Sequence, residues 1–121
     1  MSEKRGPDLG ASFVASGDLS GSQFRLVAFD GNNVFLPTSG MLCAGVLQNK
    51  PKHGEHASVI GIGYSKVQVG AALNSRAPFQ AGSSGFALAV DSGSWTQGVI
   101  ITTTVSGEIG EALVFPGNRH A

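Results

Sequence analysis

An internal repeat constrains the fold of this chain more than any other feature of its sequence. Three dipeptides, which begin at positions 39, 45 and 54, occur again in the same order 53 residues later, at positions 92, 98 and 107. They are Ser39-Gly40, Gly45-Val46 and Gly54-Glu55, which return as Ser92-Gly93, Gly98-Val99 and Gly107-Glu108. Each copy has the pattern of a turn, a strand that begins at Gly-Val, a loop, and a Gly-Glu turn into another strand. A repeated unit of this kind predicts a small β scaffold.

Chance alignment of glycines is the alternative explanation, because the chain holds 18 glycines and glycine-rich sequences match themselves easily. The common spacing of nine residues between the Gly-Val and Gly-Glu pairs, 45 to 54 and 98 to 107, argues against chance. Residue character also matches between the dipeptides, where Leu47 corresponds to Ile100 and Ile60 to Leu113. We therefore expect the repeated glycines and glutamates to be structural turn residues.

Local signals favour short strands from residue 23 onward. The clearest is a hairpin, in which residues 24–29 and 34–36 flank the turn cluster Asp30-Gly31-Asn32-Asn33, whose residue types tolerate positive φ. Residues 69–74 could form one helical turn at most, because Gly70 and a loop-like run interrupt them. Further strands are expected at 43–48, 57–62, 65–69, 86–90, 98–104 and 111–115.

These signals together predict an all-β chain of about eight short strands with low helix content. We expect a small single-domain β-barrel or β-tulip-like fold with an internal strand-turn duplication and an extended N-terminal arm. The order of the strands stays open, because regularly spaced short strands fit a closed barrel, a sandwich or an open tulip equally well.

The length of 121 residues predicts one domain, with an extended arm at 1–20, a compact β domain at 21–117 and a tail at 118–121. The arm has neither helical nor strand periodicity, so we expect it to be disordered or to lie on a partner. Its first residues carry both charge signs and no apolar run follows them, so we expect no secretory signal and synthesis in the cytoplasm. Nowhere is there an apolar run of about 18 residues, which a membrane-spanning helix would need.

Charge argues against two classes of partner. Eight basic residues balance eight acidic ones, and only 13% of the chain is charged. Nucleic acid and anionic membranes are bound through a positive patch that this composition does not supply, so we expect neither partner. A sparsely charged surface is also poorly protected against self-association, which favours a homo-oligomer.

Residues that could carry chemistry are few, and each has a structural explanation. His53, Glu55 and His56 could form a metal site together with His120, but the second Gly-Glu turn has no histidine, so we favour a solvated loop without metal. Cys43 has apolar neighbours and is expected to be a buried, inert thiol. No Ser-His-Asp arrangement can be nominated either, so we expect no cofactor and no enzyme activity.

Two further patterns allow binding. Gly61 and Gly63 superficially resemble a phosphate-binding loop, but a strand-like alternation and not a helix follows them, which favours close strand packing or a bulge. Tyr64 and Trp95 are the candidate ligand residues, because their flat rings could form a platform for a sugar or a base. Ordinary packing at the end of a barrel explains them equally well.

One set of segments between residues 20 and 115 points to a family. The set comprises Phe24-Arg25-Leu26-Val27, Asp30-Gly31-Asn32, the run from Ala44 to Pro51, Gly54-Glu55, Gly98-Val99 and Gly107-Glu108. This pattern resembles the small capsid cement (decoration) proteins of tailed bacteriophages. Its most specific part is the segment 45–51 followed by the first Gly-Glu pair.

The resemblance implies a compact β domain, commonly trimeric, on the outer surface of an icosahedral head in the virion. Such a protein clamps neighbouring subunits of the major capsid protein by binding alone, after synthesis in the host cytoplasm. An N-terminal arm can then be ordered on the capsid, with Leu9, Phe13 and Val14 as anchors. The alternative is a free-standing β-barrel module that binds a small ligand or glycan through Tyr64 and Trp95.

Overall fold

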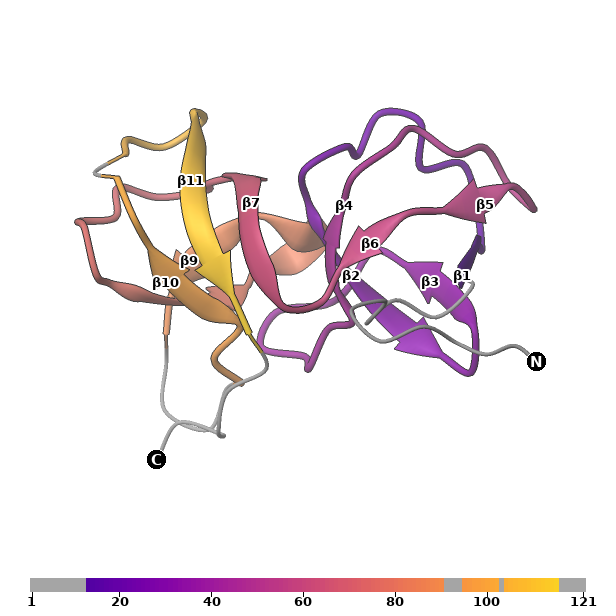
Figure 1. Cartoon of the computed structure of the whole chain (residues 1–121), viewed down its shortest axis with the longest axis horizontal. Helices are drawn as coiled ribbons and strands as arrows, with labels where there is room; N and C mark the ends of the chain where they lie inside the picture. Colours follow the sequence, from indigo (N-terminus) through magenta and orange to yellow (C-terminus); the bar gives the residue numbers. More distant parts are fainter. Residues whose placement is uncertain (1–12, 91–94, 103, 116–121) are drawn as a thin grey trace.

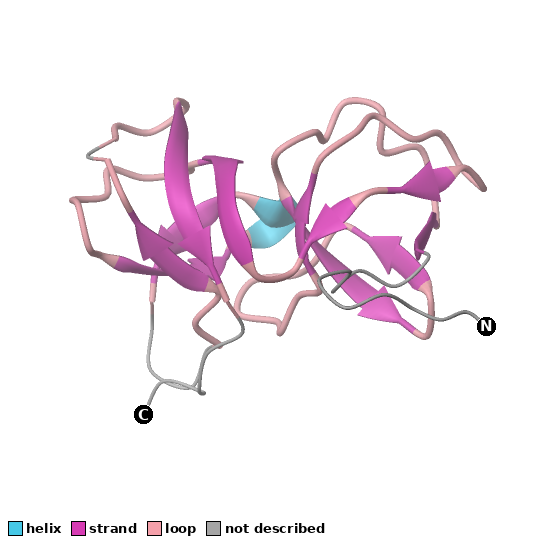
Figure 2. Ribbon diagram, in the orientation of Figure 1, coloured by secondary structure: helices cyan, strands magenta, loops and turns pink. Residues whose placement is uncertain are grey.

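The computed structural model describes residues 13–90, 95–102 and 104–115 of the chain. In this part the chain forms eleven short strands and a single 3-10 turn, η1 (Ser83–Gly85), so the predicted all-β fold is confirmed (Figure 2). The strands gather into two lobes that follow one another along the chain (Figure 1). We call β1 to β6 the first lobe and β7 to β11 the second lobe.

The first lobe is a six-stranded sheet in the order β5-β1-β3-β2-β4-β6. Its strands are β1 (Phe13–Ala15), β2 (Leu26–Asp30), β3 (Asn33–Phe35), β4 (Gly45–Leu47), β5 (His56–Ala57) and β6 (Val59–Ile60). The two edge strands β5 and β6 are separated in the chain only by Ser58. One continuous stretch of chain therefore forms both edges, and the sheet is nearly closed into a barrel.

The second lobe is a five-stranded sheet in the order β7-β11-β10-β8-β9. Its strands are β7 (Gly63–Gln68), β8 (Pro78–Ala81), β9 (Ala87–Ala89), β10 (Gly98–Ile100) and β11 (Ile109–Val114). A parallel bridge between Val69 and Ala87 joins the chain at the end of β7 to β9, so this sheet also nearly closes on itself. The single strand β11 pairs with both β10 and β7, and it thus takes the place that β5 and β6 share in the first lobe.

The duplication seen in the sequence extends over both lobes. Val46 pairs with Ile60 in the first lobe, and Val99 pairs with Leu113 at the corresponding place in the second. The connections outside the strands repeat as well. The backbone N–H of Ala15 donates to the carbonyl of Glu55 at 2.9 Å, and that of Val69 donates to the carbonyl of Glu108 at 2.9 Å.

Each lobe has its own apolar interior, built from matching positions. The pairs of buried residues are Ala15 and Val69, Leu19 and Leu73, Val27 and Phe79, Val34 and Ala87, and Leu47 and Ile100. The second lobe has the larger side chain at Phe79 and the smaller one at Ala87. Exchanges of this kind keep the total volume of a close-packed interior similar while individual residues diverge.

The lobes pack against each other through the outer face of the first sheet. Leu26, Ala28 and Val46 alternate with the residues that fill the first lobe, so they point away from its interior, yet none of them is exposed. They belong instead to the apolar cluster of the second lobe. Hydrogen bonds cross the same contact, including Gln68 N–H to the carbonyl of Phe24 at 2.7 Å.

The expected arm at 1–20 was placed wrongly at its C-terminal end. Phe13–Ala15 form β1, which pairs in parallel with β3 and antiparallel with β5, and the side chain of Leu19 is buried in the first lobe. These residues lack strand periodicity because three residues are too few to show it, and the pairing is with partners distant in sequence. Residues 1–12 and the predicted tail at 118–121 lie outside the described residues.

Candidate functional site

The outer face of the second sheet carries a row of apolar side chains across four strands. In the strand register Pro78 lies beside Val99, Val99 beside Leu113, and Leu113 beside Tyr64. Paired residues project to the same side of a sheet, so the four side chains form one row away from the interior of the lobe. The row is open to solvent, with Tyr64 54% and Leu113 47% exposed.

Two more residues continue this row beyond the strand ends. Ile62 lies two residues before Tyr64 and is 54% exposed, and Phe115 lies two residues after Leu113 and is 38% exposed. We call the six residues the apolar face: Ile62, Tyr64, Pro78, Val99, Leu113 and Phe115. Single exposed apolar residues are ordinary on protein surfaces, but a contiguous set of this size marks a place where another surface binds.

Strand β11 shows how the chain produces this face. Its first two inward positions, Gly110 and Ala112, are small and buried, and Val114 is the third buried position, whereas the larger side chains of Ile109 and Leu113, and of Phe115 just after the strand, point outward. A methyl group at Gly110 would overlap the side chain of Thr104, so the interior has no room for a larger residue there. The strand therefore has its bulky apolar residues on the side opposite to the core of its own lobe.

A pair of opposite charges lies beside the apolar row. Glu111 is directly opposite Lys66 in the register of β11 and β7, on the same outer side as Tyr64 and Leu113. A hydrogen bond to the Glu111 carboxylate raises the pKa of the Tyr64 hydroxyl, so this tyrosine is neutral over the physiological range. The Lys66 ammonium lies 5.8 Å from the centre of the Phe24 ring. The charges of Lys66 and Glu111 are thus opposite and adjacent.

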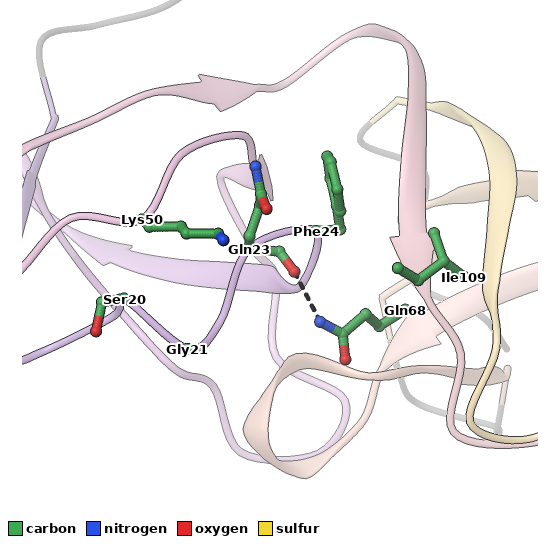
Figure 3. A pocket seen from close by; sticks show the side chains of 7 residues that line it. All are labelled: Ser20, Gly21, Gln23, Phe24, Lys50, Gln68 and Ile109. Atoms are coloured by element: carbon green, nitrogen blue, oxygen red, sulfur yellow. Dashed lines mark hydrogen bonds between the residues drawn. The ribbon is translucent and has the colours of Figure 1, made fainter.

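A shallow pocket of about 240 Å³ lies where the two lobes meet (Figure 3). Its lining residues are Ser20, Gly21, Gln23, Phe24, Lys50, Gln68 and Ile109. The Gln68 side-chain amide donates to the carbonyl of Gln23 at 2.7 Å and closes one wall. Lys50 supplies an ammonium group, but the residues that line this pocket include no carboxylate, imidazole or thiol.

Tyr64 and Trp95 have different settings. Tyr64 is an exposed member of the apolar face. Trp95 is half-buried just before β10, and its backbone N–H donates to the carbonyl of Gly40 at 3.3 Å. The cation–π pairs found among the described residues involve Phe24 and Phe86, not these two rings. Their proposed joint use as a ligand platform stays a prediction.

His53 and His56 both have structural roles. His53 accepts a hydrogen bond at Nδ1 from the backbone N–H of Gly17 at 2.8 Å, and His56 lies in β5 beside Val14. Across the described ranges, no three His, Cys, Asp or Glu side chains come close enough to hold a metal ion. His120, the third histidine of the sequence, lies outside these ranges.

Cys43 is buried, and burial raises its pKa to about 12. Its Sγ lies 3.7 Å from the carbonyl of Met41, in the contact between the lobes. The thiol is therefore protonated at neutral pH and is a poor nucleophile.

The two Gly-Glu pairs of the repeat occupy matching turns, whereas Gly45 and Gly98, which were expected in turns, are the first residues of β4 and β10. Gly54 and Gly107 have φ of +85° and +89°, a conformation that favours glycine. A carboxylate oxygen of Glu55 accepts from the backbone N–H of Lys52 at 2.8 Å, and one of Glu108 accepts from that of Val105 at 3.1 Å. Both turns are thus closed by the glutamate that follows the glycine.

The predicted anchors of the arm separate into two groups. Phe13 and Val14 lie half-buried in β1, where Phe13 packs against the interior of the first lobe. Leu9 lies outside the described residues. The apolar face on the second lobe was not predicted, although the alternation of residue size from 109 to 115 carries its signal.

Comparison with known proteins places the fold but assigns no family. No family model and no curated protein sequence matches the chain. Among solved structures, the fold is similar to "The crystal structure of head fiber gp8.5 N base in bacteriophage phi29", with a TM-score of 0.71 and 13% sequence identity. The match covers 86% of this chain and 91% of that chain. At this identity the likeness concerns the fold. Within the part of the chain that can be described, no helix is long and apolar enough to cross a membrane.

Proposed function

We propose that this chain is a structural, non-catalytic protein of a bacteriophage virion and that it binds the outer surface of the head. The observation that carries this proposal is the fold, which the chain has in common with the base of a phage head fiber over most of the length of both chains. The segments of the sequence that resemble phage cement proteins favour the same setting.

The proposed mechanism is binding alone. The partner is the major capsid protein, and each copy contacts neighbouring capsid subunits after synthesis in the host cytoplasm. Added contacts across the joints of the shell favour the closed head by mass action, because rupture must break them as well. Copies of this chain associate into a homo-oligomer, which we propose is a trimer. A net charge of zero supports such crowding, because many copies side by side do not repel one another.

A second role follows from the same structural likeness. The matched structure is described as the base of a fiber, so this chain could hold a fiber on the head instead of reinforcing the shell. The two roles differ in what the head gains. A cement protein raises the resistance of a DNA-filled head to rupture, whereas a fiber base leaves that resistance unchanged.

Co-sedimentation with heads of the source phage that lack this protein tests the proposal. We expect saturable binding at a fixed ratio of this chain to the major capsid protein. Heads that already carry the protein are the control and should take up little more. Absence of binding by the folded protein would overturn the head-binding function.

Heating the decorated and undecorated heads then separates the two roles. DNA release at a higher temperature from decorated heads supports the clamp. Equal release temperatures at full occupancy would support the fiber base and contradict the clamp.

A further inference from the structure

The apolar face of the second lobe has a counterpart in the first lobe. Leu26 pairs with Val46, and Val46 with Ile60, as Pro78 pairs with Val99, and Val99 with Leu113. These two rows lie at the same place on the outer face of the two repeated sheets. What covers the first row therefore indicates what kind of surface can cover the second.

The row of the first lobe is covered by another lobe of the same fold. Leu26 and Val46 are completely buried and belong to the apolar cluster of the second lobe. Gly85 approaches the backbone of Leu26 so closely that a methyl group would overlap its carbonyl oxygen. Beside it, the Arg25 guanidinium carbon lies 4.3 Å from the centre of the Phe86 ring. The covering surface thus includes η1, β7 and the buried apolar cluster of the second lobe.

Among the residues that the structure describes, none covers the row of the second lobe in this way. Leu113 is 47% exposed, Pro78 is exposed and Val99 is half-buried. The same position on the sheet therefore changes from fully buried to open between the lobes, while its apolar character is kept.

We propose that the apolar face of the second lobe is the contact between copies of this chain, and that a lobe of a second copy covers it. Two observations favour a second copy over a differently charged partner. The equivalent face is already covered by a lobe of this fold, and the neighbouring Lys66 and Glu111 are oppositely charged in a chain whose net charge is zero. This inference deepens the homo-oligomer of the proposed function.

The contact inside the chain also indicates the symmetry of the assembly. The outer row of the first lobe meets η1, β7 and the buried apolar cluster of the second lobe, and that cluster does not include the residues of the second lobe's own apolar face. A contact between two different surfaces is heterologous, and repeated copies joined in this way form a ring when the rotation closes. A cyclic oligomer such as a trimer is the expected result.

The mass of the purified full-length protein in solution, measured by light scattering after size-exclusion chromatography, tests this inference without any heads. We expect the wild-type protein to be a cyclic oligomer. Leu113→Glu places a charge in the contact and should reduce the mass to that of one chain. Phe29→Glu is the matched control, because Phe29 is 44% exposed on the first lobe, and this variant should keep the wild-type mass.

A second variant guards against misfolding of the first. Tyr64→Lys changes a side chain that is more than half exposed and stands beside Glu111, and it should also yield single chains with a wild-type circular dichroism spectrum. A monomeric wild-type protein would overturn the inference, as would an oligomer that survives both folded variants. If the wild-type protein is a monomer and Leu113→Glu abolishes its binding to heads, the capsid is the occupant of the face. That result would overturn this inference and leave the head-binding function standing.

Discussion

Gly45 and Gly98 occupy the same position in the two lobes. Each is the first residue of a strand and lies in close contact with the backbone of the neighbouring strand. Their φ values are +151° and +155°, and a Cβ atom at either would overlap the carbonyl oxygen of Ile60 or Leu113. Glycine is required here by both conformation and space. This close approach explains why the Gly-Val pair is among the few features of the repeat that both copies keep.

Substitution of Gly98 by alanine should therefore destabilise the protein severely. The added methyl group must displace backbone and not a mobile side chain, so we expect a loss of about 2–4 kcal/mol in the free energy of unfolding. Urea denaturation followed by tryptophan fluorescence measures it. Gly21→Ala is the control, because a Cβ there meets no atom within 4 Å, and it should have little effect. Equal stabilities of the two variants would contradict the structural role of Gly98.

Glu55 should stabilise its turn through hydrogen bonding and not through charge. Its carboxylate accepts from the backbone N–H of Lys52 at 2.8 Å in an exposed loop, so Glu55→Ala should cost about 0.5–1.5 kcal/mol. Glu55→Gln keeps an acceptor oxygen and should recover most of this loss. Thermal unfolding of the two variants at equal salt concentration decides the point, and equal losses in both would indicate that the charge matters instead.

Cys43 should make the protein less stable at alkaline pH. Burial raises the thiol pKa from 9.0 to about 12 in the folded chain, so above pH 9 the unfolded state loses a proton that the folded state keeps. The free energy of unfolding then falls as pH rises from 9 towards 12, by up to about 1 kcal/mol per pH unit.

The comparison that isolates this effect uses Cys43→Ala, which removes the titrating group. The fall in stability between pH 8.5 and 10.5 should be less steep in the variant than in the wild-type protein. The native thiol should also resist a disulfide reagent at pH 8 and react once the chain is unfolded. Fast reaction of the native protein would show that Cys43 is accessible, in conflict with its burial.

Two N-terminal truncations should distinguish residues that are needed for folding from residues that are needed only for binding. Removal of residues 1–18 deletes β1, whose Ala15 is buried and whose backbone is paired on both sides, so this variant should unfold at a much lower temperature. Removal of residues 1–12 leaves β1 in place and should keep the wild-type melting temperature. If Leu9 is an anchor on the capsid, the shorter truncation should still bind heads more weakly. Undiminished binding would contradict that role.

How far the fold could be predicted depended on how local each signal was. The hairpin of β2 and β3 was foreseen closely, because Asp30 to Asn33 favour a turn whatever surrounds them. Strand β8 was missed, because Phe79 to Ala81 have no alternation and Pro78 argues against a strand. Here Pro78 begins the strand, and the positions that follow are all buried.

The duplication was recognised only in part for a geometric reason. Gly45 and Gly98 are 53 positions apart, but Ala15 corresponds to Val69 after 54 positions (69 less 15), and Leu26 to Pro78 after 52 (78 less 26). Single-residue insertions and deletions in the loops shift the register. The side chains at these positions also diverged, since packing requires a total volume and not particular residues.

The sequence by itself determined what is set within a few residues along the chain: the all-β character, the turns, and the glycines that the backbone conformation demands. Only the tertiary structure decided that two barrels form, that β1 belongs to the first, and which outer row is covered. Alternation along a strand separates its two faces but does not say what lies against either of them. Val46 and Val99 follow equivalent glycines in equivalent strands, yet Val46 is buried by the next lobe and Val99 is half-buried at a surface that the described residues leave open.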